Sequence, residues 1–526
     1  MFSVPFPVRR PVSLVRSVPG LATLAVVATA ACVYDARVPS EPAIARAPQL
    51  SAMAVSVASS AGVVATGRLI VSFTGSAPAT FAAQVAALGG KVVWASSDAG
   101  LAAVSGLTGS GPTKLAGMKG VQEVDADAAI PLDLPLIATE STVDAAGVAS
   151  NANPAGAVRF ARQWNMLAVQ ADAAWAHGFL GSSNVSIFML DSGIDYLHAD
   201  LVGRVDLNRS LDLTGTFLTQ AVVNKDTVIV PFTEADTVAK YFPGRFAFTD
   251  LFFHGTHTGA TVSSNAVRAA GITSGTTLVA VKVCGYINEC PFSSILNGII
   301  YAALNGADVV NMSLGGAFTK AGNGRFVGLL NKVFNFARSR GVTVVVSAGN
   351  SAADLDHDVN TYWTFCNTPS VICVSATGPL ADANAFNPNG NLARTGPFTS
   401  VDAPAYFTNF GRSAISVGAP GGNSSFGPPL PRPAGRDVFV WAACSQTSLL
   451  IGCFSSPFFI VGAQGTSMSA PHVSGTAALL VSILGRNPGL IKARIQQTAD
   501  NVAGNGTTQF YGKGRLNVAR AVGAIP

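Results

Sequence analysis

Five short apolar runs rich in β-branched residues recur from residue 184 onward, and longer segments with helical periodicity lie between them. A continuous apolar run of this length is typical of a strand that is buried on both faces. Strands of this kind that alternate with helices indicate a mainly parallel sheet with helices on both faces, which is an α/β fold. The runs are 184–191, 277–283, 307–314, 342–350 and 370–377, and the helical segments include 291–306 and 323–341.

A smaller unit with a different pattern precedes this domain. Between residues 67 and 129, four strand-like segments alternate with two short helical segments, which predicts a small α+β domain. Residues 33–66 and 131–158 have neither period, so we expect linkers there, the second one exposed and sensitive to proteases. The predicted divisions are an export signal (1–32), a linker (33–66), the small domain (67–130), a second linker (131–158) and the α/β domain (159–526).

The first 32 residues have the pattern of an export signal. Three arginines precede an apolar run, Leu21–Ala31, that is too short to span a bilayer comfortably. The run ends in "TAAC", which resembles a bacterial lipoprotein signal with Cys32 as the lipidated residue, although Thr29 stands where leucine is usual. The protein is therefore expected to be secreted, or anchored to the cell envelope if Cys32 is lipidated.

The six cysteines beyond Cys32 fall into three pairs of near neighbours. None of the pairs has the spacing of a zinc knuckle, and export places them in an oxidising compartment, so we predict disulfides. Free buried thiols are the alternative. The expected pairs are Cys284/Cys290, Cys366/Cys373 and Cys444/Cys453.

Composition excludes some classes of function. About half of the residues are apolar (49%) and only 12% are charged, so the chain has ample material for a large core. The net charge is +5, but lysines and arginines are scattered and no run combines basic with aromatic residues. Nucleic-acid binding is therefore not expected.

Polar residues that directly follow the apolar runs are candidates for a site, because ligands bind at the carboxyl ends of parallel strands. Asp191 ends the first run, Asn350 ends the fourth, and Ser313, Leu314, Gly315 and Gly316 follow the third. Asp191 and Asn350 are also common in turns, so neither is decisive alone.

Two segments add histidine and serine. His254 and His257 lie three residues apart on one helical face, but the zinc motif with a glutamate and histidines four apart is absent, which favours a general base. Ser467 precedes Pro471 where a helix should begin, at the positive end of the helix dipole. A plain N-cap serine is the alternative.

The motifs "MLDSGID", "HGTHTGA", "NMSLGG", "SAGN" and "GTSMSAPHVSG" occur in that order. Together they resemble the subtilisin-like serine protease family from about Trp164 to the end of the chain, with no further domain after it. Residues 67–129 are similar to the inhibitory propeptide of that family. An α/β-hydrolase is disfavoured, because its triad order is serine, acid, histidine and its nucleophile has glycine on both sides.

The resemblance implies roles for individual residues. Asp191 would orient His254, His254 would act as the base and Ser467 as the nucleophile, and Asn350 with the Ser467 N–H would bind the oxyanion. His257 and Ser469 would be structural. The residues implied to line the first specificity pocket and to bind substrate are Ser313, Leu314, Gly315 and Gly316.

The implied protein is a secreted, self-processed endopeptidase of broad specificity that prefers apolar residues before the cut. It would act as a monomer on proteins or peptides, with its own propeptide as inhibitor and membrane contact only through a lipid on Cys32. No cofactor is needed for the chemistry, and structural calcium is common in the family, although the sequence assigns no ligands. The alternative function is an inactive, subtilase-like surface binding protein.

Two features depart from the family pattern. The interval from Asp191 to His254 is 63 residues (254 − 191), which is longer than in compact members and predicts an added loop beside the substrate cleft. Leu251, Phe252 and Phe253 precede His254 where Asp or Asn is common.

Overall fold

The computed structural model describes residues 64–132, 136–140, 147–223, 226–287, 289–321, 324–358, 360–363, 365–368, 370–379, 401–423, 438–451, 453, 456–504 and 506–526. All of them fall within one compact unit. The predicted export signal, Cys32 and most of the first predicted linker lie outside the described residues.

The largest sheet has eight strands, in the order β17-β16-β14-β12-β6-β10-β7, with β18 also paired to β16. All its pairings are parallel except that of β17 with β16. The five predicted apolar runs supply five adjacent strands, so the α/β prediction is confirmed. The strands are β6 (Ser186–Asp191), β7 (Leu211–Asp212), β10 (Thr277–Lys282), β12 (Val309–Met312), β14 (Thr343–Ser347), β16 (Ile372–Gly378), β17 (Ala403–Pro404) and β18 (Val417–Pro420).

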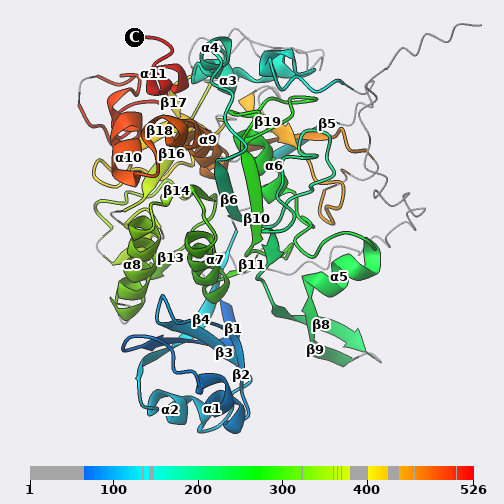
Figure 1. Cartoon of the computed structure of the whole chain (residues 1–526), viewed down its shortest axis with the longest axis vertical. Coiled ribbons are helices and arrows are strands. Elements are labelled where there is room, and N and C mark those ends of the chain that lie inside the picture. The colour runs from blue at the N-terminus through cyan, green and yellow to red at the C-terminus, as the bar shows by residue number, and fades with distance from the viewer. Residues whose placement is uncertain are drawn as a thin grey trace, which may run out of the picture. The chain divides into compact units, whose positions relative to one another are not determined.

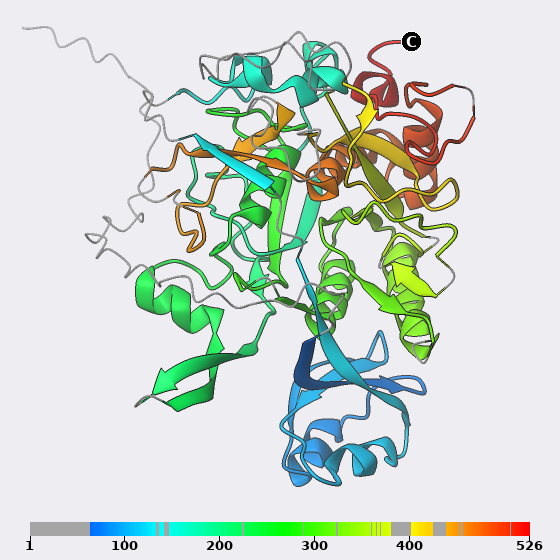
Figure 2. The same cartoon turned by 180° about the vertical axis from the view of Figure 1, so that it is seen from behind.

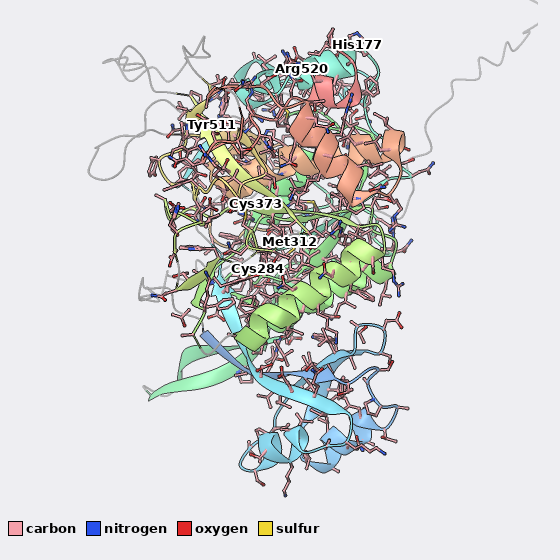
Figure 3. The ribbon with its side chains drawn as sticks, turned by 90° about the vertical axis from the view of Figure 1, so that its left-hand side faces the viewer. His177, Cys284, Met312, Cys373, Tyr511 and Arg520 are labelled. Atoms are coloured by element: carbon pink, nitrogen blue, oxygen red, sulfur yellow. A yellow bond between two sulfur atoms is a disulfide. The ribbon has the colours of Figure 1, made fainter. Side chains whose placement is uncertain are left out.

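Both faces of the five central strands are buried, which is why these strands are mainly apolar. Phe188 and Leu190 of β6 belong to one core, with residues of α7 and α8, whereas Ile187 and Met189 belong to a second core with residues of α9 and α10. Successive strand residues point to opposite faces, so a helix layer on each face requires apolar residues at every position. Figure 3 labels Cys284, Met312 and Cys373, three buried members of the first core.

The helices begin and end close to the segments that periodicity predicts. In particular, α7 and α8 lie within the predicted segments 291–306 and 323–341. The helices of the α/β domain are η1 (Pro154–Gly156), η2 (Phe160–Arg162), α3 (Trp164–Ala168), α4 (Ala171–Ala176), α6 (His254–Val262), α7 (Phe292–Leu304), α8 (Gly324–Ser339), α9 (Thr466–Leu484), α10 (Pro488–Gln497) and α11 (Val518–Val522).

Helix α9 is the one helix within the described residues that is long and apolar enough to cross a membrane. Its most apolar window is 83% buried inside the protein, as expected of a central core helix.

A five-stranded sheet in the order β11-β4-β1-β3-β2 contains the N-terminal segments. Helices α1 and α2 share a separate core with this sheet through Phe81, Val85 and Leu115. Strand β1 begins at Val64, three residues before the predicted boundary, because it already pairs there with Ala129. The elements are β1 (Val64–Phe73), α1 (Phe81–Ala87), β2 (Lys91–Ser96), β3 (Leu101–Ser105), α2 (Gly111–Ala116), β4 (Val121–Pro131) and β11 (Glu289–Pro291).

The long interval before His254 forms a hairpin and a helix: β8 (Thr216–Val223), β9 (Asp226–Thr233) and α5 (Glu234–Tyr241). Figure 2 shows this insertion projecting beside the rest of the chain. A buried ion pair holds its base, with Nζ of Lys282 2.6 Å from Oε2 of Glu234.

The second predicted linker differs from the expectation, because it contains a strand, β5 (Leu136–Glu140). This strand pairs antiparallel with β20 (Ile460–Gln464), which also pairs with β19 (Val440–Ala443). Its partner lies more than 300 residues away, so the local sequence carries no sign of it. A further small sheet joins β13 (Ala317–Thr319) to β15 (Thr361–Trp363).

Candidate active site

An aspartate and a histidine meet where β6 ends and α6 begins. Nδ1 of His254 donates a hydrogen bond of 2.7 Å to Oδ1 of Asp191, and both side chains are completely buried. The carboxylate also accepts from the Ser192 backbone N–H (2.7 Å) and from the Thr258 hydroxyl (3.0 Å). These bonds hold the imidazole in one orientation and leave Nε2 as its proton-accepting nitrogen.

The turn before His254 is organised by Asp250, whose role the sequence reasoning missed. Its carboxylate accepts hydrogen bonds from the backbone N–H groups of Phe252, Phe253 and Thr256, and from the hydroxyls of Ser192 and Thr256. Burial raises its pKa from 3.8 to about 6, although the bonds from Thr256 oppose the rise. The sequence contained one sign of this role: Asp250 lies four residues before His254, close to the predicted start of a helix, where an aspartate can accept from backbone N–H groups.

Ser467 is the second residue of α9 and is almost fully buried, with 5% of its surface exposed. Its Oγ donates to the backbone oxygen of Ser313 at 3.0 Å, while the Ser313 hydroxyl donates to the Ser467 backbone oxygen at 2.8 Å. Nε2 of His254 is buried without a hydrogen-bond partner among the described residues. His254 is therefore held in a fixed orientation, and its Nε2 is available to accept a proton.

Asn350 is positioned by the residue before the serine. Its side-chain oxygen accepts from both the backbone N–H (2.8 Å) and the hydroxyl (2.9 Å) of Thr466. The Asn350 loop is in turn held by Asn409, which donates to the Ala348 oxygen and accepts from two backbone N–H groups. Gly349, with φ of 96°, packs against that side chain, and a Cβ there would lie 2.5 Å from Nδ2 of Asn409. Asn409 is a second positioning residue that the sequence did not reveal.

The segment Ser313, Leu314, Gly315 and Gly316 leads from β12 toward β13. Leu314 is buried, and both glycines are half-buried. Next to Gly316 lies Ile130 of the small domain, so near that a Cβ on the glycine would be 2.9 Å from Cγ2 of Ile130. Ile130 also pairs with Cys290 of β11. The end of β4 thus lies between β11 and the predicted substrate-binding wall.

The next described strand after β4 pairs with a strand that lies close in sequence to the predicted nucleophile. On one side of residues 133–135, which lie outside the described residues, β4 pairs with β11. On the other side, β5 pairs with β20, and only Gly465 and Thr466 separate β20 from Ser467. The two described ends of this connection therefore pair with β11 on one side and with the strand that leads to Ser467 on the other.

The other motif residues have structural surroundings. Nε2 of His257 donates to the Val440 oxygen at 3.0 Å, and burial lowers the pKa of His257 to about 4. Ser469 is fully buried, and its hydroxyl has no hydrogen-bond partner among the described residues. Within the described residues, the side-chain hydrogen bonds of Asp191 are made with Ser192, His254 and Thr258.

The sulfur atoms of the three predicted cysteine pairs lie at bonding distance in the structure, and all six side chains are buried. The Cα separations are 4.1 Å for Cys284–Cys290, 5.1 Å for Cys366–Cys373 and 6.1 Å for Cys444–Cys453. Cys32 lies outside the described residues. Within those residues, no cluster of three or more His, Cys, Asp or Glu side chains is arranged to hold a metal ion.

An α/β domain with a buried Asp–His pair and a serine at a helix start is the arrangement of a serine hydrolase. Residues 182–514 match the model of the subtilase family. The chain belongs to this family, whose members are serine endopeptidases that need no cofactor for catalysis, and the protein is a serine endopeptidase.

Two relatives are similar over about two thirds of the chain. The chain is 28% identical to thermitase from Thermoactinomyces vulgaris over 364 residues, which are 69% of this chain and 96% of the relative. It is 27% identical to subtilisin from Bacillus pumilus over 356 residues, which are 67% of this chain and 96% of the relative.

Two solved structures share the fold at lower sequence identity. The epidermin leader peptide processing serine protease from Staphylococcus aureus has a TM-score of 0.62 and 19% identity, over 86% of this chain and 97% of that one. Fervidolysin from Fervidobacterium pennivorans, a keratinolytic enzyme related to subtilisin, has a TM-score of 0.61 and 20% identity, over 88% of this chain and 61% of that one.

Proposed function

We propose that the protein is an exported endopeptidase in which Asp191, His254 and Ser467 form the catalytic triad. The observation that carries the proposal is the fully buried hydrogen bond of 2.7 Å between Asp191 and His254, made by residues 63 positions apart. Removing a carboxylate and an imidazole from water costs free energy. Buried titratable pairs of this kind cluster at active sites.

In the proposed reaction, Oγ of Ser467 leaves the Ser313 oxygen and hydrogen-bonds Nε2 of His254. The imidazole takes the proton as Oγ attacks the peptide carbonyl, and Asp191 stabilises the imidazolium. The Asn350 side-chain amide and the Ser467 backbone N–H donate to the oxyanion, which the start of α9 also favours electrostatically. His254 then protonates the leaving amine, and water hydrolyses the acyl-enzyme by the same route.

We further propose that extended peptides bind along Ser313–Gly316 and prefer apolar residues before the cut. One contact of the chain with itself and the burial of two apolar residues support this proposal. Ile130 packs against Gly316, and both Ile130 and Leu132 are 1% exposed. An apolar side chain a few residues before the cut would bury the same surface.

Residues 67–130 would act as an inhibitory propeptide, and Ser467 would cut the processing linker, residues 131–158. The pairing of β4 with β11 supports both ideas, since it occupies an edge that a substrate strand would need. Disulfides and the resemblance to secreted relatives fit an extracellular protein. Lipidation of Cys32 rests on the likeness of "TAAC" to a lipoprotein signal, whereas a monomeric state and structural calcium rest on the family.

Self-processing is tested with two serine variants expressed in a host without extracellular proteases. Ser467→Ala should keep residues 67–130 covalently attached and lose peptidase activity by about 10⁶-fold, the figure known for the related subtilisin. Ser469→Ala is the matched control and should be processed and active. Intact mass and casein hydrolysis are the measurements, and a fully processed Ser467→Ala protein would rule out self-cleavage.

A serine-directed fluorophosphonate probe separates this proposal from an inactive binding protein. The mature protein should be labelled at Ser467, as identified by peptide mass. Absence of labelling in a correctly folded, mature preparation would favour the inactive alternative.

A further inference from the structure

Helix α5 of the insertion places a carboxylate in the interior of the protein. Glu234, the first residue of α5, is completely buried, although the hairpin that precedes it projects beside the rest of the chain (Figure 2). Its two carboxylate oxygens contact different segments. Oε2 lies 2.6 Å from Nζ of Lys282, and Oε1 accepts a hydrogen bond from the backbone N–H of Tyr286. One side chain of the insertion therefore contacts both the end of β10 and the loop that follows it.

Lys282 extends this contact to the turn before the proposed base. Its Nζ also donates to the backbone oxygen of Thr249 at 2.8 Å. Thr249 directly precedes Asp250, whose carboxylate accepts from backbone N–H groups at the start of α6. His254 is the first residue of α6. The ammonium group of Lys282 therefore links Glu234 to the turn that carries His254.

The second oxygen of Glu234 holds the start of the loop that leads to β11. A disulfide between its two end residues closes the loop 284–290, and Tyr286 lies near its start. The insertion packs tightly against this loop, because a Cβ on Gly285 would lie 2.8 Å from Oε1 of Glu234 and 2.9 Å from Cζ of Phe217. Strand β11, at the other end of the loop, pairs with β4. The position of β11 therefore depends on a loop that the insertion holds.

The energetics of the buried ion pair favour a role beyond stability. The side chains of Glu234 and Lys282 are both 0% exposed. Burial raises the pKa of Glu234, and the charge of Lys282 opposes that rise. Removal of two charges from water is costly, and an apolar pair of similar volume is often equally stable or more stable. The fixed positions that the pair gives to Thr249 and Tyr286 are a better explanation for its presence.

We propose that Glu234 is a positioning residue for catalysis. Through Lys282 it fixes the turn that carries His254, and through Tyr286 it fixes the loop that leads to β11. The insertion thereby supports the active site from outside the triad. This inference rests on the proposed functions of His254 as the base and of the β11 edge in binding substrate.

Glu234→Gln in the self-processed protein tests the link to the turn. The amide keeps an oxygen for the Tyr286 N–H, but it presents N–H groups to Lys282, so two donors face each other. We expect kcat to fall by roughly tenfold or more with little change in KM, since a displacement of about 1 Å at a reacting group can cost about 100-fold. Asp236→Asn, the same charge change on the exposed side of α5, should keep both constants.

In this experiment kcat is referred to the active sites titrated with the fluorophosphonate probe, so unfolded protein does not contribute. An unchanged kcat in Glu234→Gln would overturn the proposal.

A double variant separates positioning from stability. Glu234→Leu combined with Lys282→Met leaves no unpaired buried charge, so its melting temperature should be at or above that of Glu234→Gln. It provides neither a donor for the Thr249 oxygen nor an acceptor for the Tyr286 N–H. We therefore expect kcat to stay low and KM to rise in this variant. Recovery of kcat together with the melting temperature would show that the pair acts only through stability, which would overturn the proposal.

Failure of the catalytic proposal gives a different result. If the unaltered mature protein cleaves no peptide and is not labelled by the probe, the proposed peptidase site is wrong. If it is active and the Glu234 variants keep its kcat, the catalytic proposal stands and the role of Glu234 is wrong.

Discussion

Inside the candidate active site, several side chains act only by holding others. Asp250 accepts five hydrogen bonds around the first turn of α6, and Asn409 fixes the loop that carries Asn350. Buried polar groups of this kind are satisfied by partners from several segments, so replacing one of them changes the positions of its neighbours. We therefore expect Asp250 and Asn409 to affect catalysis by fixing the positions of His254 and Asn350.

Asp250→Asn tests this role. An amide presents an N–H where the carboxylate accepts from Thr256 or Ser192, so two donors would face each other beside His254. We expect kcat to fall by roughly tenfold or more, with a smaller change in KM, because an unsatisfied buried group costs about 1–3 kcal/mol. Steady-state kinetics on one peptide measures both constants. Asp236→Asn, on the exposed start of α5, is the control, and an unchanged kcat in Asp250→Asn would contradict the assignment.

Asn350→Leu tests the proposed oxyanion donor. The leucine side chain is similar in size but cannot donate a hydrogen bond, so it should leave substrate binding largely intact. We expect kcat to fall by about 100- to 1000-fold with little change in KM. Comparison of kcat and KM with those of the unaltered protein is the measurement, and a loss confined to KM would place Asn350 outside the reaction.

Between secondary-structure elements, two charged residues join the small domain to the α/β domain. Asp127 of β4 accepts from the backbone N–H (2.9 Å) and the hydroxyl (2.6 Å) of Ser293, in the first turn of α7. Arg68 of β1 donates to the Thr214 oxygen (2.6 Å) at the base of the insertion. Burial lowers the pKa of Arg68, while Asp127 and Asp212 oppose the shift. A negative charge at the start of a helix is favourable, so this contact should strengthen binding.

Asp127→Asn in the isolated segment 67–130 should weaken its inhibition of the mature enzyme. Loss of a buried charge at the start of α7 costs about 1–2 kcal/mol, or roughly 5- to 30-fold in the inhibition constant. Asp98→Asn is the matched control, since Asp98 makes only an exposed, 3.4 Å ion pair with Arg340. Equal inhibition by the Asp127 variant and the unaltered segment would show that this cap adds nothing.

The stability of the folded protein depends on pH through two buried histidines that are costly to protonate. Burial lowers the pKa of His257 and of His472 from 6.5 to about 4. His472 is held by Asn165, whose Nδ2 lies 2.9 Å from Nε2, and by the Met468 oxygen. Both imidazoles therefore stay neutral in the folded state at pH values where they are protonated in the unfolded chain.

The sign of the pH dependence follows from these depressed values. Above pH 6.5 both states are neutral and the stability is complete, whereas between about pH 6.5 and 4 only the unfolded state gains protons, so stability falls. Each histidine accounts for roughly 3 kcal/mol over this range. In the Ser467→Ala background, His472→Gln should show a shallower loss of unfolding free energy between pH 7 and pH 4 in urea titrations.

His177→Gln is the control for that experiment, because His177 is exposed on α4's C-terminal side (Figure 3). Its stability profile should follow that of the parent protein. Parallel profiles for His472→Gln and the parent would contradict the proposed origin of the acid sensitivity.

Three features were determined by the sequence itself. The apolar runs predicted five adjacent strands, because a strand that is covered on both faces must be apolar at every position. The close spacing of six cysteines predicted the three pairs that the structure brings to bonding distance. The order of motifs predicted that Asp191 would meet His254, and their hydrogen bond of 2.7 Å joins them.

Only the tertiary structure decided the contacts between distant segments. The sequence predicted a linker at β5, because its partner, β20, is more than 300 residues away. The ion pair between Lys282 and Glu234 joins a strand of the large sheet to the insertion before His254. Asp250 and Asn409 are ordinary turn residues until the backbone groups that they hold are brought around them. The local pattern of apolar residues determines which residues are buried. The partner of a strand edge or of a buried polar group depends on the path of the whole chain, which a local pattern does not contain.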